Sequence, residues 1–312
     1  MTTKKILANL AAIEKWIDEA PDPSTFHSNN DFMSFVVELM NRCLYLLKVG
    51  VSLAPTEEAT HKGYSKQKII IVGHMVRIVK LYEGILIHVS QRQLELASIF
   101  MRLIYETSIR MNYLIKSSTK RKTISSFILA SYRPEKDVLE DLSNKQNSRP
   151  LINIESRIKK QIEKLLKRDG VTKTELSSNR IWNVDGKDFR RILSDMDKDL
   201  AYSYIFGTGS HYVHGDWHEI RYHHIQKKGR YYLPKLNFSD PDPRIACPLT
   251  MVCLDALLLY LKWGKSDPDG VVTPIASRLK TLCESVDSAH EKTLVPKKLN
   301  ACTKSKKIKP ES

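Results

Sequence analysis

The chain gathers half of its ten histidines into one stretch, Tyr202–His224, which reads YSYIFGTGSHYVHGDWHEIRYHH. Imidazoles exchange protons near neutral pH and bind divalent metals, so this concentration predicts either a proton-transfer site or a metal site. If the stretch stays helical through Gly215, the spacing of His211, His214 and His218 places them on one helix face. Gly215 and the glycines before it favour a helix that is interrupted or ends there.

Three interpretations of these histidines remain open. In a metal centre, His211, His214 and His218 would be ligands, with Glu106 or Asp216 as the carboxylate. In a metal-free site, one or two histidines would act as general acid and base beside charged residues of an earlier helix. In the third interpretation they are structural or surface residues. The sequence contains no HExxH spacing, no glycine-rich phosphate loop and no GxSxG elbow, so no motif decides among the three.

A narrow polar stripe runs along the apolar segment 94–115, and its members are Glu95, Ser98, Arg102, Glu106 and Arg110. Arg102 and Glu106 stand four residues apart on a helix, so we expect their side chains to pair. The stripe is either an edge at which the helix meets water or a set of buried charges, which often marks a functional site. Because the segment is apolar around most of its circumference, we expect a central, buried helix that packs against residues 199–215.

The charge balance is strongly basic, with 50 Lys and Arg against 35 Asp and Glu and a net charge of +15. Such an excess is either a solvated basic surface or a sign of an anionic partner, such as nucleic acid, nucleotide or a membrane surface. The basic helix expected at 154–167 has the same two interpretations, a solvated face or a patch for phosphate backbones. Residues 291–312 hold seven lysines and two glutamates and are expected to form a disordered basic tail.

The cysteines and the apolar segments bear on the compartment. The five cysteines are widely spaced without a CxxC pair, which argues against a disulfide framework and a zinc ribbon. The first twenty residues carry acids and do not resemble a secretory signal. The richest apolar run, 249–263, is shorter than the roughly 18 residues that a membrane span needs, and it contains Asp255. We therefore expect a cytoplasmic protein with no membrane partner.

Apolar residues recur at helical spacing through most of the chain, which predicts an all-α protein, a single compact multi-helix bundle. The expected helices cover 4–19, 31–49, 65–115 with a break near Ser90, 123–144 with a break at Pro134, 154–167, 189–200, 248–263 and 274–290. Alternating residues around Lys228-Gly229 predict a small β-hairpin near 219–234. Residues 1–290 are expected to form one helical domain, followed by the tail 291–312.

Two segments resemble a family of bacterial helical proteins of unknown function. They are IFMRLIYETSIRMNYLI at 99–115 and YSYIFGTGSHYVHG at 202–215. Members of that family carry an Arg-x-x-x-Glu pair in an apolar helix, and then a Tyr, a Ser and a His-Gly step near the end of a later helix. The matching residues are Arg102, Glu106, Tyr204, Ser210 and His214. The resemblance implies that Arg102, Glu106, Ser210 and His214 come together in the fold.

A more distant similarity is to the HEPN superfamily of small helical nucleases and nucleotide-binding proteins, which are common in toxins and phage defence. Those proteins carry an Arg followed by four to six residues and then a His on one helix. None of the ten histidines here has an arginine at that distance, so a HEPN-type ribonuclease would need an Arg and a His from two helices.

Together these features predict a helical protein whose polar site acts on or binds RNA or a nucleotide, in a defence or toxin setting. In this hypothesis Arg102 holds a phosphate, His214 and His211 act as acid and base, and Glu106 and Ser210 complete the site. The alternative is a non-enzymatic helical interaction module with a structural polar cluster. A metal-dependent hydrolase that uses the histidine ligands named above is the third hypothesis. The sequence predicts no cofactor, apart from the divalent metal that the third hypothesis requires, and it indicates no oligomeric state.

Overall fold

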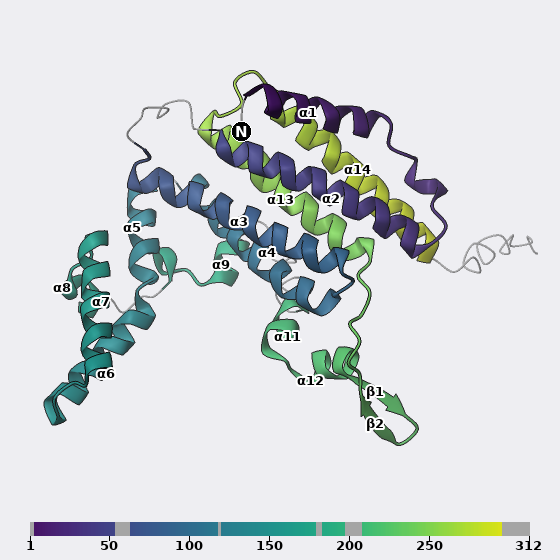
Figure 1. Cartoon of the computed structure of the whole chain (residues 1–312). Helices are drawn as coiled ribbons and strands as arrows, with labels where there is room; N and C mark the ends of the chain where they lie inside the picture. The colour runs from purple at the N-terminus through teal and green to yellow at the C-terminus, as the bar shows by residue number, and fades with distance from the viewer. Residues whose placement is uncertain (1–2, 54–62, 118–119, 179–182, 197–207, 295–312) are drawn as a thin grey trace, which may run out of the picture. The chain divides into compact units, whose positions relative to one another are not determined.

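Nearly all regular structure in the described part of the chain is helical (Figure 1). The structure is a computed structural model, and the residues that it describes are 3–53, 63–117, 120–178, 183–196 and 208–294. Its contacts group into two compact units, the first made of residues 1–112 and 203–312 and the second of residues 113–202. The prediction of an all-α, multi-helix protein with one small hairpin is confirmed.

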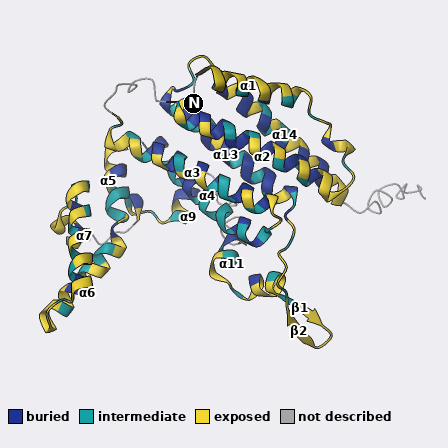
Figure 2. Ribbon diagram, in the orientation of Figure 1, coloured by how far each residue is buried: buried dark blue, intermediate teal, exposed yellow. Residues whose placement is uncertain are grey.

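Four long helices form the core of the first unit: α2 (Asn29–Ser52), α3 (Lys66–Ser90), α13 (Pro243–Gly264) and α14 (Val272–Leu294). The helix α1 (Thr3–Asp18) packs on α14 and α2, and the 3-10 turn η1 (Pro23–Thr25) connects it to α2. Buried residues concentrate on the faces that these helices turn toward one another (Figure 2). The buried hydroxyls of Tyr82 and Thr250 lie 2.9 Å apart and link α3 to α13. The four described cysteines are free and buried there.

The helix α13 starts earlier than expected. The side chain of Asp242 accepts a hydrogen bond from the amide of Arg244, and Pro243 occupies the first helical position, so this cap begins the helix five residues before 248. The resulting 22 residues are long and apolar enough to cross a membrane by length and composition, which corrects the expectation of a segment too short to do so. The core helix of a soluble protein passes the same test, and 56% of this apolar window is buried in the protein.

The long apolar region breaks as expected between α3 and α4 (Leu94–Lys116). Arg92 takes the left-handed backbone conformation, with φ of +57°, at the turn. The two helices approach closely at Gly84, where a Cβ atom would lie 3.0 Å from the ring of Phe100. A Cβ atom at Gly73 would meet no neighbour within 4 Å, so only one of the two glycines within α3 is explained by a close contact.

The second unit consists of short and medium helices, namely α5 (Lys120–Ala130), α6 (Arg133–Ser148), α7 (Asn153–Asp169), α8 (Lys173–Ser178), η3 (Val184–Gly186) and α9 (Phe189–Ser194). The predicted break at Pro134 is confirmed, whereas the sequence predicted no helix over the residues of α8 and η3. Its hydrophobic core is built around Tyr132, Ile162, Leu166 and Leu176. Asp185, with φ of +54°, accepts hydrogen bonds from the hydroxyls of Tyr113 and Thr123 at 2.9 and 2.8 Å.

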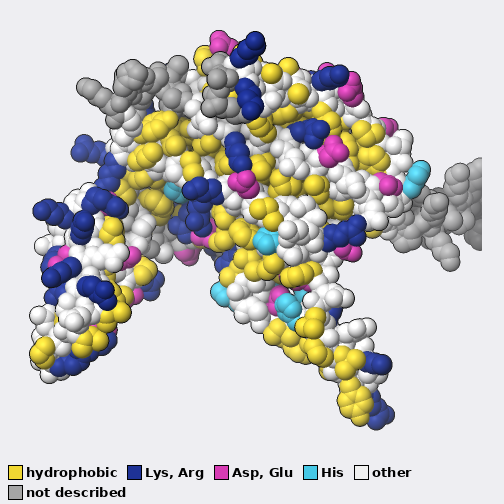
Figure 3. Space-filling view, viewed as in Figure 1, with side chains coloured by type: hydrophobic (Ala, Val, Ile, Leu, Met, Phe, Trp, Pro, Cys, Tyr) yellow, Lys and Arg dark blue, Asp and Glu magenta, His cyan; other side chains and the backbone are white. Residues whose placement is uncertain are grey.

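The second unit carries more net positive charge per residue than the first. It holds 20 Lys and Arg against 13 Asp and Glu, a net charge of +7 out of the +15 of the whole chain. Along α7 the basic side chains other than the half-buried Lys159 are exposed, while Ile162 and Leu166 are buried. Lys and Arg side chains are prominent over α6 and α7 in Figure 3. The helix at 154–167 therefore has a solvated basic face, and its binding of phosphate backbones stays a prediction.

The histidine stretch continues into the hairpin through three short helical elements. They are α11 (Thr208–His214), α12 (Trp217–Glu219) and the π-helix η5 (Ile220–His224), followed by β1 (Ile225–Lys228) and β2 (Tyr231–Pro234). The hairpin and its turn at Gly229 are confirmed. The expectation of a strand before 225 is wrong, because Asp216 accepts the amides of His218 and Glu219 and starts a helix.

Two predictions lie outside the described residues. One is the disordered tail, since the described part of the chain ends at Leu294, four residues beyond the predicted end of the helical domain. The other is the helix expected over 189–200, of which α9 describes the first six residues. The prediction of one helical domain over 1–290 stays a prediction.

Candidate functional site

The helix α11 ends before Gly215, which takes a left-handed conformation with φ of +59°. Three of the predicted site residues therefore do not share one continuous helix: His211 and His214 lie on α11 and His218 lies on α12. The turn nevertheless brings the rings of His211 and His218 to a centroid distance of 5.1 Å. His214 is exposed at the end of α11.

His211 is held by a carboxylate. Its Nδ1 is bonded to Oδ2 of Asp216, and the other oxygen of Asp216 accepts the amides of His218 and Glu219 at 2.9 and 3.3 Å. The hydrogen bond with His211 lowers the pKa of Asp216 below its ordinary value, and the two amides act in the same direction. The side chains of His211 and Asp216 are 39% and 42% exposed, so a dissolved substrate can reach them. This pair can exchange protons with a ligand.

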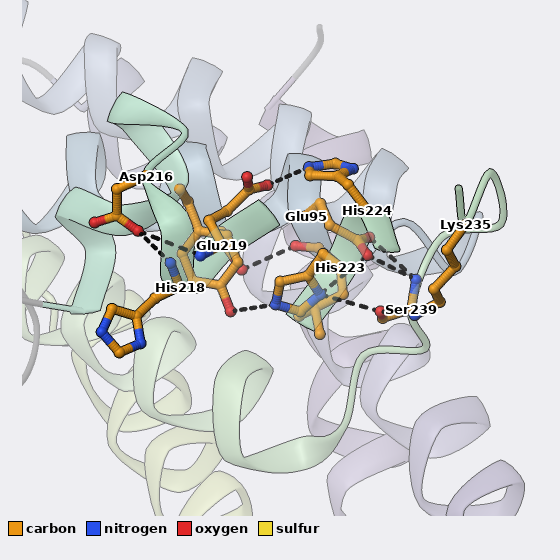
Figure 4. Close-up of polar contacts among 11 residues, drawn as sticks. Glu95, Asp216, His218, Glu219, His223, His224, Lys235 and Ser239 are labelled. Atoms are coloured by element: carbon orange, nitrogen blue, oxygen red, sulfur yellow. Dashed lines mark hydrogen bonds and ion pairs between the residues drawn. The ribbon is translucent and has the colours of Figure 1, made fainter. Parts of the chain in front are cut away.

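A second histidine is held in a buried position against α4. Nδ1 of His223 lies 3.1 Å from Oε1 of Glu95 and 3.1 Å from the hydroxyl of Ser239, and Nε2 lies 3.3 Å from the hydroxyl of Tyr212 (Figure 4). The amide of Ser239 donates to both carboxylate oxygens of Glu95, at 3.0 and 3.1 Å. The side chains of Glu95 and His223 are 6% and 13% exposed. This cluster ties the two ends of the hairpin segment to α4.

The ionisation of the buried cluster follows from these contacts. Burial would raise the pKa of Glu95, but hydrogen bonds from its own amide and from Ser239, with the nearby His223, lower the pKa overall. Burial raises the pKa of Tyr212, so its hydroxyl keeps its proton at neutral pH. The phenol of Tyr212 can donate a hydrogen bond to Nε2 of His223, whose Nδ1 faces Glu95. The cluster is therefore a carboxylate, an imidazole and a phenol in series.

A third pair completes the set. Nε2 of His224 lies 2.5 Å from Oε1 of Glu219, and the side chain of Glu219 is 8% exposed while that of His224 is 51% exposed. Figure 4 shows this pair beside the buried cluster. Three histidines within residues 211–224 are thus each bonded to a carboxylate, and the pairs differ in how far they are buried.

The polar stripe on α4 changes character along the helix. At its start Glu95 and Ser98 are buried, with exposures of 5% and 0%. Further along, Glu106 accepts two hydrogen bonds from Arg110, at 2.7 and 3.1 Å, and the two side chains are 30% and 38% exposed. The predicted pairing of Arg102 with Glu106 is therefore wrong: the arginine one turn later pairs with the glutamate, where both can reach water.

Arg102 instead faces α11. A Cβ atom at Gly209 would lie 3.1 Å from the Cβ of Arg102, so a side chain there would push α11 and α4 apart by a few tenths of an ångström. This contact confirms the predicted packing of α4 against residues 199–215 for the described portion, which begins at Thr208. The half-buried Ser210 follows directly on α11, whereas Glu106 lies one turn further along α4 in its pair with Arg110. Tyr204 lies outside the described residues.

Sequence reasoning missed the groups that orient the histidines. Glu95 was noticed only as part of the stripe, Asp216 only as a metal ligand, and His223 was assigned to a strand. Ser239 lies in SDPDP, a segment that indicated only the end of the hairpin. The one available signal was the acidic start of an apolar helix, since a carboxylate in such a position needs polar partners.

The described residues contain no group of three or more His, Cys, Asp and Glu side chains arranged to hold a metal ion. The metal hypothesis placed His211, His214 and His218 together with Asp216 or Glu106. In the structure Asp216 holds His211 through Nδ1, His214 is exposed, and Glu106 is bonded to Arg110.

The fold and the site together define a predominantly helical protein with histidine–carboxylate pairs between α4 and a β-hairpin. Residues 68–231 match a family of unknown function, DUF5677, and since this is more than half of the chain, the protein belongs to that family. No curated protein and no solved structure matches the chain. The matched residues include α4, α11 and η5, and thus the histidine–carboxylate pairs. Bacterial origin and similarity to HEPN proteins stay predictions.

Proposed function

We propose that the protein acts on RNA or a nucleotide by general acid–base chemistry at the His211–Asp216–His218 group. The observation that carries this proposal is the ring of His218 at 5.1 Å from that of His211, which is itself bonded to Asp216. Cleavage of RNA by its own 2′-hydroxyl needs one group to take the proton of the attacking oxygen. It needs a second group to protonate the oxygen that leaves phosphorus. Two neighbouring, accessible imidazoles suit these two roles.

The surrounding residues have supporting roles in this proposal. Asp216 would fix the orientation of His211 and stabilise its protonated form, as a carboxylate does for an imidazole in many hydrolases. Arg102, whose side chain packs against Gly209, would bind a phosphate oxygen. His214 is exposed one turn along α11 and remains a further candidate for proton transfer. The net charge of +15 would raise the local concentration of a polyanion.

The test is cleavage of a fluorescently labelled RNA oligonucleotide by the full, untagged chain in the presence of a chelator. His211→Ala and His218→Ala should each lower the rate by about 100-fold or more, because each removes a proton-transfer group. His27→Ala is the matched control, because His27 is an exposed histidine in the segment between α1 and α2. This variant should cleave RNA at the rate of the wild type.

Two outcomes would contradict the proposal. Equal cleavage by wild type, His211→Ala and His218→Ala would show that the activity lies elsewhere. Cleavage that appears only when a divalent metal is added would favour the metal-dependent hydrolase. Circular dichroism of each variant separates loss of chemistry from loss of fold.

The second candidate is a non-enzymatic interaction module with a structural polar cluster. The observation that favours it is the buried Glu95–His223 pair, which joins α4 to the chain on both sides of the hairpin and is poorly placed to meet a substrate. This candidate expects RNA to remain intact with every variant, while the fold depends on Glu95.

A further inference from the structure

The chain around the hairpin carries an unusual density of exposed aromatic and apolar side chains. Their exposed fractions are 56% for Trp217, 68% for Tyr222, 78% for Tyr231, 50% for Tyr232, 92% for Leu236 and 47% for Phe238. The hairpin extends away from the helices of its unit, and hydrophobic side chains cover much of it in Figure 3. Contiguous exposed apolar surface of this kind marks an interaction site.

The same segment is uniformly basic. Residues 220–238 contain five Lys and Arg and no Asp or Glu, and the basic residues are Arg221, Lys227, Lys228, Arg230 and Lys235. All of these except Lys235, which is partly buried, are exposed. A surface that combines aromatic rings with cations and lacks carboxylates is complementary to a partner with flat apolar groups joined by anions.

The strand register places rings and cations side by side. Lys228 pairs with Tyr231 and Lys227 pairs with Tyr232, and residues paired directly across two strands share one face of the hairpin. Neighbouring pairs point to opposite faces. Each face of the hairpin therefore presents one tyrosine next to one lysine, with Cβ atoms roughly 5 Å apart.

The aromatic surface is continuous with the histidine site. The ring of Trp217 lies edge-on to that of Tyr232 at a centroid distance of 6.4 Å and an interplanar angle of 75°. Trp217 directly precedes His218, whose ring neighbours that of His211. A ligand that lies on the hairpin therefore has a path toward the proposed proton-transfer group.

We propose that the hairpin is a binding surface for single-stranded RNA. Bases stack on Tyr231, Tyr232 and Trp217, while Lys227 and Lys228 neutralise the adjoining phosphates. This inference rests on RNA being the substrate of the proposed function, and it adds that the strand is single, because only unpaired bases offer free faces for stacking. A membrane surface fits less well, since the tyrosine–lysine pairs point to both faces of the hairpin, which a flexible single strand can reach by passing around the turn and a flat bilayer cannot.

The experiment measures binding of a fluorescein-labelled 12-nucleotide 2′-O-methyl oligouridine to the full chain by anisotropy. The methyl groups remove the attacking hydroxyl, so binding is separated from cleavage. The double substitution Tyr231→Ala and Tyr232→Ala should weaken binding at least tenfold, because base stacking on an aromatic ring is worth about 1–3 kcal/mol per base. The matched substitutions to Phe keep both rings and should bind within about twofold of the wild type.

Two further variants separate the contribution of the lysine charges from that of exposed apolar surface. Replacing Lys227 and Lys228 by Gln should make the dependence of log K on log salt shallower by about 1.4, as expected for two phosphate contacts on a single strand. Leu236→Ser removes the most exposed apolar side chain of the segment without removing a ring. It should leave RNA binding unchanged.

Equal affinity of the wild type and the double alanine variant would overturn the inference. It would also be overturned if both the double alanine variant and Leu236→Ser lost binding to phosphatidylcholine–phosphatidylserine vesicles while RNA binding stayed intact, since the surface would then bind membrane. The inference and the proposed function fail separately. A wild type that binds through the tyrosines but never cleaves RNA contradicts only the function, and cleavage with tyrosine-independent binding contradicts only the inference.

Discussion

Two histidine–carboxylate pairs in this protein have the same chemistry and different surroundings. His211 and Asp216 lie at a helix end with about two fifths of each side chain exposed, whereas His223 and Glu95 are almost fully enclosed beside α4. An unpaired charge is costly in a buried position, so removal of one partner of the enclosed pair should destabilise the fold strongly. The exposed pair adds little to the fold and is free to meet a ligand. The proposed function therefore uses the exposed pair for chemistry and leaves the enclosed pair a structural role.

The largest expected effect on stability comes from Glu95→Ala. The substitution removes the acceptor of the Ser239 amide and of the His223 ring in a buried position, and each charged hydrogen bond contributes about 1.5–3 kcal/mol. We expect the free energy of unfolding in urea to fall by about 3 kcal/mol. Asp216→Ala is the corresponding change in the exposed pair and should cost only about 1 kcal/mol, because it removes the N-cap of the short helix α12. Similar losses of unfolding free energy in the two variants would show that burial does not distinguish the two pairs.

The pH dependence of stability tests whether the buried carboxylate of Glu95 stabilises the fold. The folded protein holds the pKa of Glu95 below its ordinary value of 4.5, so the carboxylate stabilises the fold above that pH and loses this contribution as the pH falls through the lower, folded pKa. The difference in the free energy of unfolding between wild type and Glu95→Gln should be present at pH 5 and above. It should shrink on further acidification. A difference that grows below pH 4.5 would mean that the pKa is raised instead.

A smaller effect is expected at the outer end of the buried cluster. Tyr212→Phe removes only the hydroxyl that faces Nε2 of His223 and keeps the ring. The expected loss is about 1 kcal/mol in urea unfolding, the usual net value of one neutral hydrogen bond. A neutral result would show that Nε2 has another partner, and the orientation of His223 would then depend on Glu95 and Ser239 alone.

The smallest effect is expected at the half-exposed end of the α4 stripe. Glu106→Gln removes an i, i+4 ion pair with Arg110 in which both side chains reach water. The loss should be under about 1 kcal/mol and should vanish at high salt. A loss as large as that of Glu95→Ala would mean that the whole stripe, and not only its first half, is part of the core.

The helices were predictable because their apolar spacing is local information. The break after Ser90 and the hairpin turn at Gly229 followed from the same short-range signals. Helix starts were less accessible, since the caps at Asp242 and Asp216 lie in segments whose composition indicated a turn or a strand. The carboxylate of Asp242 starts α13 five residues before the predicted start. The carboxylate of Asp216 starts a helix directly before the segment in which a strand was expected.

The sequence predicted that the histidine stretch lies against the segment 94–115, and it did not predict how their side chains pair. The histidine stretch and the stripe on α4 were both recognised, and the structure does place them together. The bond between Glu95 and His223 joins residues 128 positions apart, and no local spacing carries that information. The choice of Arg110 over Arg102 as the partner of Glu106 is likewise decided by which side chain faces α11 and which faces water.

The most direct test of this account compares His211→Gln with His223→Gln in two assays, RNA cleavage and urea unfolding. The account predicts that His211→Gln keeps the urea midpoint of the wild type and loses about 100-fold or more in cleavage rate. His223→Gln should unfold at lower urea, and its folded fraction should cleave RNA at the rate of the wild type. The account is contradicted if His211→Gln cleaves normally or if His223→Gln keeps its stability and loses its activity.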